Sequence, residues 1–155
     1  MKNAEIIAHK LTSRQLTLAT AESCTGGLIA KTLTDRTGSS AFFLAGFVTY
    51  ANAAKTKFLR VPASLIEKHG AVSSEVVRAM AVGARSVTGA DLSVAVTGIA
   101  GPTGGTTNKP VGLVFLAAAS ADKTITKRVI FPGTRKQVRE QACQAALEIL
   151  LKLIK

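Results

Sequence analysis

Two mainly apolar stretches, LTLATAES (residues 16–23) and AFFLAGFVTYA (residues 41–51), flank a segment with helical spacing. In that segment Ile29 and Leu33 lie four residues apart, and Gly38 marks its end. Parallel strands need a crossover connection, and that crossover is usually a helix. The pattern therefore predicts an α/β fold that contains a parallel pair of strands, with residues 41–51 as a buried strand.

Three further stretches, residues 91–98, 111–120 and 124–131, have strand composition, and a three-residue turn joins the last two as a hairpin. The connection GIAGPTGGTTNKP has no helical pattern, so the strands on either side of it are more easily antiparallel neighbours. Most of the remaining sequence has helical patterns, and the last helix opens with a capping box, Thr134 and Gln137. We expect one domain, residues 1–155, with a three-layer α/β/α architecture and a mixed, mostly parallel sheet that has one antiparallel strand.

Composition and charge exclude several classes of protein for this chain. No apolar run approaches the length of a membrane span, and the charged N-terminus has no apolar core of a secretion signal. Two cysteines do not make a disulfide framework, so we expect a cytoplasmic protein. The net charge of +11 raises nucleic acid as a partner, but the basic residues are scattered and aromatic residues are few. A solvated basic surface, or attraction of a small anion, is the simpler interpretation.

The segment TAESCTGGLIAK, residues 20–31, runs from a predicted strand into a predicted helix. In α/β domains ligands bind at this place, beyond the carboxyl ends of the strands. The segment offers three candidate nucleophiles, Ser23, Cys24 and Thr25. The amides of Gly26 and Gly27 are candidates for holding a phosphate or a developing oxyanion. The structural alternative is a capped turn, with Thr25 or Ser23 as the N-cap.

Cys24 lacks an obvious activating base. A nucleophilic thiolate normally needs a nearby histidine or another base. His9 falls in the first predicted helix and His69 at the end of another helix, where each is expected on the surface. We therefore interpret Cys24 as a small buried residue. Two separate histidines and no cluster of carboxylates also speak against a dedicated metal site.

A serine without a histidine can be activated by a lysine whose burial keeps it neutral. GFVTYANAAK places Tyr50 and Lys55 just after the second predicted strand, at the same sheet end as Ser23 if the first two strands are parallel. The structural alternatives are core packing for Tyr50 and a solvated helix position for Lys55. For Glu22 two roles remain open, a buried structural partner or a substrate contact.

The segment TGIAGPTGGTTNKPVG, residues 97–112, leaves the end of another strand and holds five glycines. Long connections of this kind are usually functional or disordered, and glycines allow close backbone approach to a ligand. Near the start of the last helix, Arg135 and Arg139 are four residues apart and suit a phosphate or a carboxylate. A solvated helix face is the alternative for this pair.

Five ordered motifs together resemble the CinA C-terminal domain family: TAESCTGG, GFVTYANAAK, GAVSSEVVRAMAVGAR, TGIAGPTGG with KPVG, and FPGTR with a following VR. The resemblance runs from about residue 4 to residue 151. The stand-alone members of this family are bacterial nicotinamide-nucleotide amidohydrolases (PncC), which convert nicotinamide mononucleotide to nicotinate mononucleotide and ammonia. We expect this chain of 155 residues to lack the additional N-terminal domain of longer CinA proteins.

The resemblance implies a serine hydrolase that needs neither metal nor cofactor and recycles pyridine nucleotides. It implies Ser23 as the nucleophile, with Tyr50 and Lys55 as its partners. The substrate-binding residues implied by the motifs and their neighbours are Thr25, Gly26, Gly27, Thr97, Gly98, Gly101, Gly105, Arg135 and Arg139, with either arginine as the substrate contact. One departure is Thr134, where the family often has aspartate.

The implied partners are the mononucleotide substrate and a second copy of the chain in a homo-oligomer, most simply a dimer, without a membrane or nucleic acid. Two other classes of function stay open at this point. One is a non-catalytic domain that senses a pyridine nucleotide. The other is a protein that associates with nucleic acid and is related to competence or to DNA damage.

Overall fold

The computed structural model of the chain describes residues 2–154. Its centre is a five-stranded sheet with the order β2-β1-β3-β4-β5. The strands span Leu18–Glu22 (β1), Phe43–Val48 (β2), Leu92–Gly98 (β3), Leu113–Ala119 (β4) and Thr124–Ile130 (β5). The helices span Lys2–Ser13 (α1), Leu28–Thr34 (α2), Asn52–Leu59 (α3), Ala63–His69 (α4), Ser74–Thr88 (α5) and Arg135–Leu153 (α6), with a short 3₁₀ helix at Ser39–Ala41 (η1).

The central strand β1 pairs in parallel with both β2 and β3. β4 is antiparallel to β3 on one side and to β5 on the other. Four strands therefore run in one direction and β4 runs against them. This confirms the predicted mixed sheet with one antiparallel strand, and it follows from the lack of a crossover helix between β3 and β4.

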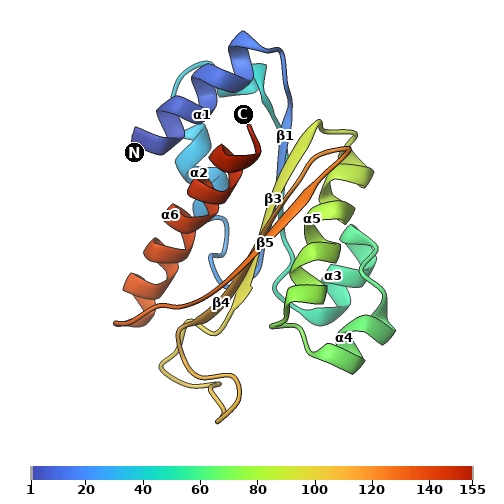
Figure 1. Cartoon of the computed structure of the whole chain (residues 1–155), viewed down its shortest axis with the longest axis vertical. Coiled ribbons are helices and arrows are strands. Elements are labelled where there is room, and N and C mark those ends of the chain that lie inside the picture. The colour runs from blue at the N-terminus through green and yellow to red at the C-terminus, as the bar shows by residue number, and fades with distance from the viewer. Residues whose placement is uncertain (1, 155) are drawn as a thin grey trace.

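Helices cover both faces of the sheet (Figure 1). α1, α2 and α6 lie on one face, over a core that includes Ile7, Leu33 and Leu147. α3, α4 and α5 lie on the other, over a core that includes Leu59 and Met80. The predicted three layers are thus present. The capping box of Thr134 and Gln137 at the start of α6 is present as well.

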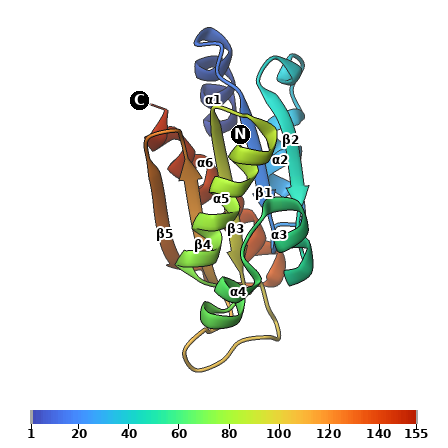
Figure 2. The same ribbon diagram turned by 90° about the vertical axis from the view of Figure 1, so that its right-hand side faces the viewer.

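Residues 41–51 contain the predicted strand, as β2, but the prediction that it is buried is wrong. β2 is an edge strand that pairs only with β1, at the opposite edge from β5 (Figure 2). Exposed and half-buried residues alternate along it, and Leu44 and Val48 are about half exposed, at 49% and 53%. An apolar pattern shows that a strand packs against something, but it carries no information on the order of strands in the sheet.

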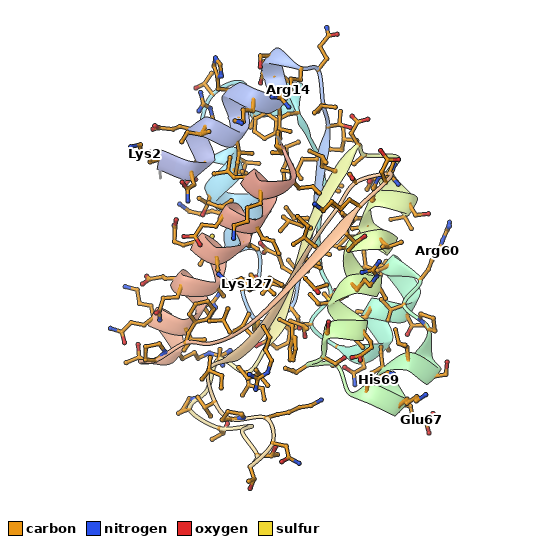
Figure 3. All side chains as sticks on the ribbon, viewed as in Figure 1. Lys2, Arg14, Arg60, Glu67, His69 and Lys127 are labelled. Atoms are coloured by element: carbon orange, nitrogen blue, oxygen red, sulfur yellow. The ribbon has the colours of Figure 1, made fainter. Side chains whose placement is uncertain are left out.

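The charged side chains are spread over the molecule (Figure 3). Lys2 and Arg14 belong to α1 and its end, Arg60 follows α3, and Lys127 lies on β5. These four basic residues therefore lie in different parts of the fold. Within residues 2–154, no helix is both long and apolar enough to cross a membrane.

Candidate active site

The carboxyl ends of β2, β1 and β3 lie side by side because the three strands are parallel. Ser23 follows β1 directly, and its amide extends the ladder by donating to the carbonyl of Val96 at 3.1 Å. Lys55 lies in α3, one turn into the helix that follows β2. Thr97 is the second-to-last residue of β3. Three consecutive strands of the sheet thus bring one polar residue each to the same edge.

The side chain of Lys55 is almost completely buried, with 1% of its surface exposed. Its Nζ lies 3.2 Å from Ser23 Oγ, 2.8 Å from the carbonyl oxygen of Thr49 and 3.2 Å from the carbonyl oxygen of Tyr50. No carboxylate is among these partners. Burial disfavours the charged form and lowers the pKa of Lys55 below its ordinary value, with the nearby Cys24 opposing the shift.

The three partners of Lys55 suit a neutral amine. A neutral amine has two N–H donors and one lone pair. Two carbonyl oxygens, those of Thr49 and Tyr50, accept the two hydrogens. As an ammonium, Lys55 also donates to the hydroxyl of Ser23; as a neutral amine, it has its lone pair left for that hydroxyl. This arrangement lets Lys55 accept the proton of Ser23 directly.

A pocket of about 290 Å³ opens at this edge of the sheet. Its polar lining includes Ser23, Lys55 and Thr97, and its apolar wall includes Val72 and Ile99. The other lining residues come from loops or from the ends of helices and strands: Cys24, Tyr50, Asn52, Ala71, Gly98, Ala100, Gly101, Thr103, Gly104 and Arg135. Thr97 is itself held in place, since its hydroxyl donates to the carbonyl oxygen of Ala71 at 3.0 Å.

Tyr50 and Arg135 contact each other at the pocket. The phenol of Tyr50 accepts a hydrogen bond from Arg135 Nη2 at 2.9 Å, and Arg135 Nη1 donates to the carbonyl oxygen of Gly101 at 2.8 Å. Tyr50 touches Lys55 only through its backbone carbonyl. The geometry therefore offers a direct proton path between Ser23 and Lys55, and none through the phenol of Tyr50.

The loop after Ser23 corrects two expectations. The N-cap of α2 is Gly27, not Thr25 or Ser23. Glycine has no side chain, so the cap residue makes no side-chain hydrogen bond to the helix. The amide of Gly26 donates to the carbonyl oxygen of Ser23, so it is not available to an oxyanion. Thr25, Gly26 and Gly27 do not line the pocket, and their role as substrate contacts stays a prediction.

Arg139 and Gly105 also lie outside the pocket lining. Arg139 donates from Nε to the carbonyl oxygen of Cys24 at 3.1 Å and from Nη2 to that of Thr25 at 3.0 Å. Gly105 packs against the backbone of Val111, which a Cβ would approach to 2.7 Å. Of the two arginines predicted as alternatives, the pocket therefore contains Arg135.

Glu22 is a buried structural partner. Its Oε1 accepts hydrogen bonds from the amides of Ile29 and Ala30, in the first turn of α2. Its Oε2 is buried without a partner among the described residues. Burial raises the pKa of Glu22 to about 7, and the amides of Ala30 and Ile29 offset only part of that shift.

Cys24 is buried, and burial raises the pKa of its thiol to about 11, so little thiolate forms at neutral pH. This agrees with the interpretation of Cys24 as a small buried residue. Nδ1 of His69 lies 3.7 Å from Oε1 of Glu75. Neither His69 nor His9 lines the pocket. Among residues 2–154, no group of three or more His, Cys, Asp and Glu side chains could hold a metal ion.

Several lining residues were missed by the sequence reasoning, among them Asn52, Val72 and Gly104. Asn52 precedes Lys55 by three residues, and that helical spacing within the motif TYANAAK was a usable signal. Val72 lies between α4 and α5, in a segment that gave no such signal. The hydroxyl of Thr97 donates to the carbonyl oxygen of Ala71 and so holds this segment, with Val72, against the end of β3.

Comparisons with known proteins agree on one family. The profile described as "CinA C-terminal domain" matches residues 1–154. A CinA-like protein of Citrifermentans bemidjiense is 55% identical over 148 residues, which make up 96% of this chain and 36% of that protein. A CinA-like protein of Geobacter sp. (strain M21) is 56% identical over 93% of this chain and 35% of that protein. The chain thus spans about a third of the length of these relatives.

A solved structure agrees closely with the fold. The crystal structure of the competence/damage inducible protein CihA from Agrobacterium tumefaciens superposes with a TM-score of 0.97 at 42% sequence identity. The match covers 99% of this chain and 94% of that one. The single α/β domain described above is therefore a shared architecture.

Proposed function

The chain belongs to the CinA C-terminal domain family, and we propose that it hydrolyses the carboxamide of nicotinamide mononucleotide to nicotinate mononucleotide and ammonia. The observation that carries the proposal is the 3.2 Å contact between Ser23 Oγ and the buried Lys55 Nζ. A serine paired with a neutral lysine is a nucleophile and base for acyl transfer. Recycling of pyridine nucleotides in the cytoplasm is the setting that this reaction fits.

In the first half of the proposed reaction, Ser23 Oγ attacks the carboxamide carbon and Lys55 takes the serine proton. When the C–N bond breaks, Lys55 returns that proton to the leaving nitrogen, and ammonia departs. In the second half, Lys55 takes a proton from water, the resulting hydroxide attacks the acyl-serine, and Ser23 leaves with that proton. The sum is one amide and one water converted to one acid and one ammonia.

The oxyanion of this reaction needs donors, and the amide of Cys24 is the best candidate. Cys24 is the residue after the nucleophile, the position that supplies an oxyanion donor in other serine hydrolases. It lines the pocket, and among the backbone hydrogen bonds of residues 2–154 its amide donates to no carbonyl oxygen. This candidate replaces the amides of Gly26 and Gly27.

The anionic end of the substrate has a partner in Arg135. A guanidinium has five N–H donors, and the bonds from Arg135 to Gly101 and Tyr50 occupy only two of its nitrogens. The exposed guanidinium at the pocket is suited to a phosphate, while Ile99 and Val72 offer an apolar wall to a flat ring. The net charge of +11 favours the approach of an anion.

The test is to incubate the purified chain with nicotinamide mononucleotide, with a chelator present, and to measure ammonia and nicotinate mononucleotide. Both products in equal amounts support the proposal. Binding of the mononucleotide without turnover identifies a sensor domain instead. If the chain neither binds nor converts the mononucleotide, the assignment of substrate is wrong.

A further inference from the structure

Two arginines one helical turn apart on α6 make entirely different contacts. Arg135 lies at the pocket, whereas Arg139 donates to carbonyl oxygens of the loop that carries Ser23. We propose that Arg139 and Glu22 are positioning residues, which hold this loop so that the hydroxyl of Ser23 faces Lys55, and that neither contacts the substrate. The inference rests on the proposed amidase function for its kinetic readout, and a second readout below is independent of that function.

Arg139 holds the middle of the loop. Its Nε and Nη2 donate to the consecutive carbonyl oxygens of Cys24 and Thr25, which lie 115 and 114 residues away in the sequence. Binding two acceptors at once uses the fixed fork of a guanidinium, which the ammonium of a lysine does not reproduce. Gly26 leaves room for this contact, because a Cβ at that residue would lie 3.2 Å from Arg139 Nη2.

Glu22 holds the two ends of the loop together. It is the last residue of β1, and its Oε1 bonds to the amides of Ile29 and Ala30 in the first turn of α2. Since the N-cap Gly27 has no side chain, Glu22 supplies the missing acceptor from outside the helix. The residue is 1% exposed, and a polar group buried in this way is costly unless it is hydrogen-bonded.

Together the two side chains restrain residues 23–27 at both ends and in the middle. Neither of them lines the pocket. Loss of either is therefore expected to reduce the fraction of molecules in which Ser23 is aligned with Lys55, and so to lower kcat while KM stays the same. Loss of a residue that binds the phosphate raises KM instead.

The kinetic experiment compares Arg139→Ala, Arg139→Lys and Arg135→Ala, with Lys136→Ala as the matched control on the same helix. Lys136 is exposed, and its Nζ lies 3.8 Å from Oε1 of Glu140 on the same helix. We expect Arg139→Ala and Arg139→Lys to lower kcat about tenfold or more with KM within twofold of the wild type, and Arg135→Ala to raise KM by a similar factor. A rise in KM for Arg139→Ala would instead make Arg139 a substrate contact and overturn the proposal.

The same comparison applies to Glu22. Glu22→Ala removes the acceptor for two amides, whereas Glu22→Gln keeps a carbonyl oxygen at that place. We expect Glu22→Ala to lower kcat about tenfold or more and Glu22→Gln to recover most of that loss. Equal activity of Glu22→Ala and the wild type would contradict the positioning role.

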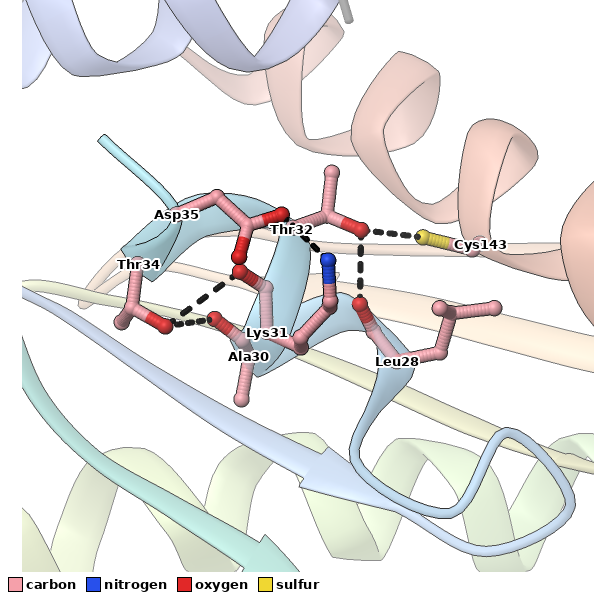
Figure 4. Close-up of polar contacts among 7 residues, drawn as sticks. All are labelled: Leu28, Ala30, Lys31, Thr32, Thr34, Asp35 and Cys143. Carbon is pink, nitrogen blue, oxygen red and sulfur yellow. Dashed lines mark hydrogen bonds and ion pairs between the residues drawn. The ribbon is translucent and has the colours of Figure 1, made fainter.

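Cys24 provides a readout that does not depend on any substrate. It lies within the loop and is 5% exposed, so release of the loop exposes its thiol. The other cysteine, Cys143, contacts the hydroxyl of Thr32 between α6 and α2 (Figure 4). A Cys143→Ser background keeps a hydroxyl at that contact and leaves Cys24 as the only thiol.

In this background the rate of modification by an aromatic disulfide reagent is measured for each variant, after circular dichroism has shown that it is folded. We expect Cys24 to react at least about tenfold faster in Arg139→Ala and Glu22→Ala than in the parent or in Lys136→Ala. Unchanged reactivity in both variants overturns the proposal even if the chain is an amidase. Faster reactivity in a chain that lacks amidase activity would leave the loop restraint standing and reject only the proposed reaction.

Discussion

Lys55 Nζ and Ser23 Oγ lie 3.2 Å apart, although 32 residues separate them in the sequence. They meet because each follows one of two adjacent parallel strands, β1 and β2, whose carboxyl ends share one edge of the sheet. Two backbone carbonyls occupy the other sides of the amine. The predictions below follow from this arrangement and from the groups that surround it.

Lys55 is expected to act only as a neutral amine. Burial lowers its pKa, so activity should rise with pH through a midpoint below the ordinary value for lysine, and it should be lost below that midpoint. Lys55→Arg keeps a positive charge at every accessible pH and should be inactive, as should Lys55→Ala. Steady-state rates across a pH series measure this. Activity that falls as the pH rises through the neutral range, or turnover by Lys55→Arg, would rule out Lys55 as the base.

Arg135 and Tyr50 are expected to act on substrate binding. Removal of a charged donor to a phosphate in Arg135→Ala should raise KM by about 10- to 100-fold with a smaller effect on kcat. Tyr50→Phe loses only the hydroxyl that accepts from Arg135 Nη2, so its KM should rise by less than about tenfold. If Tyr50→Phe instead abolished kcat, the phenol would belong to the proton path.

Glu22 makes stability depend on pH in a direction opposite to that of a salt-bridged carboxylate. Its pKa is about 7 in the folded chain, and the ordinary value of 4.5 applies to the unfolded chain. At a pH between these two values, the folded state keeps a proton that the unfolded state has lost. The free energy of unfolding should therefore fall as the pH rises from 4.5 to 7, by at most about 3 kcal/mol from this group. Glu22→Gln has no titrating group at this position. Its free energy of unfolding, taken relative to that of the wild type, should therefore rise as the pH goes from 4.5 to 7. Urea unfolding at several pH values measures the difference, and parallel curves for the two proteins would contradict it.

Gly83 permits the close contact between α5 and the end of α3. A Cβ at this residue would overlap the carbonyl oxygen of Leu59. In an open helix position Gly→Ala stabilises by about 0.5–1 kcal/mol, but here we expect Gly83→Ala to destabilise by about 1–3 kcal/mol. Ser86→Ala, an exposed position on the same helix, is the matched control and should be neutral or slightly stabilising. A Gly83→Ala protein as stable as the wild type would show that the helices can separate without cost.

The pairing of Ser23 with Lys55 was predictable because it depends on local patterns alone. A strand, a helix and a second strand make a parallel pair, and residues just after both strands then share one edge. The antiparallel β4 was predictable for the same reason, since the glycine-rich connection has no crossover helix. These inferences use only the type and order of elements.

The roles of Arg139 and β2 could not be obtained in this way. The contact of Arg139 with the carbonyls of Cys24 and Thr25 depends on how α6 packs over the start of α2, which no local pattern specifies. The edge position of β2 depends on which strand occupies the centre of the sheet. The cap of α2 was also missed, because its acceptor, Glu22, lies in the preceding strand and not at the N-cap.

The central claim is that Ser23 is the nucleophile of an amidase, and the most direct measurement compares Ser23→Ala with the wild type. Both proteins are titrated with nicotinamide mononucleotide by calorimetry, and both are assayed for ammonia and nicotinate mononucleotide. We predict that Ser23→Ala stays folded, binds the mononucleotide with an affinity close to that of the wild type, and loses turnover by at least about 1,000-fold. Turnover by Ser23→Ala at the rate of the wild type would contradict the account.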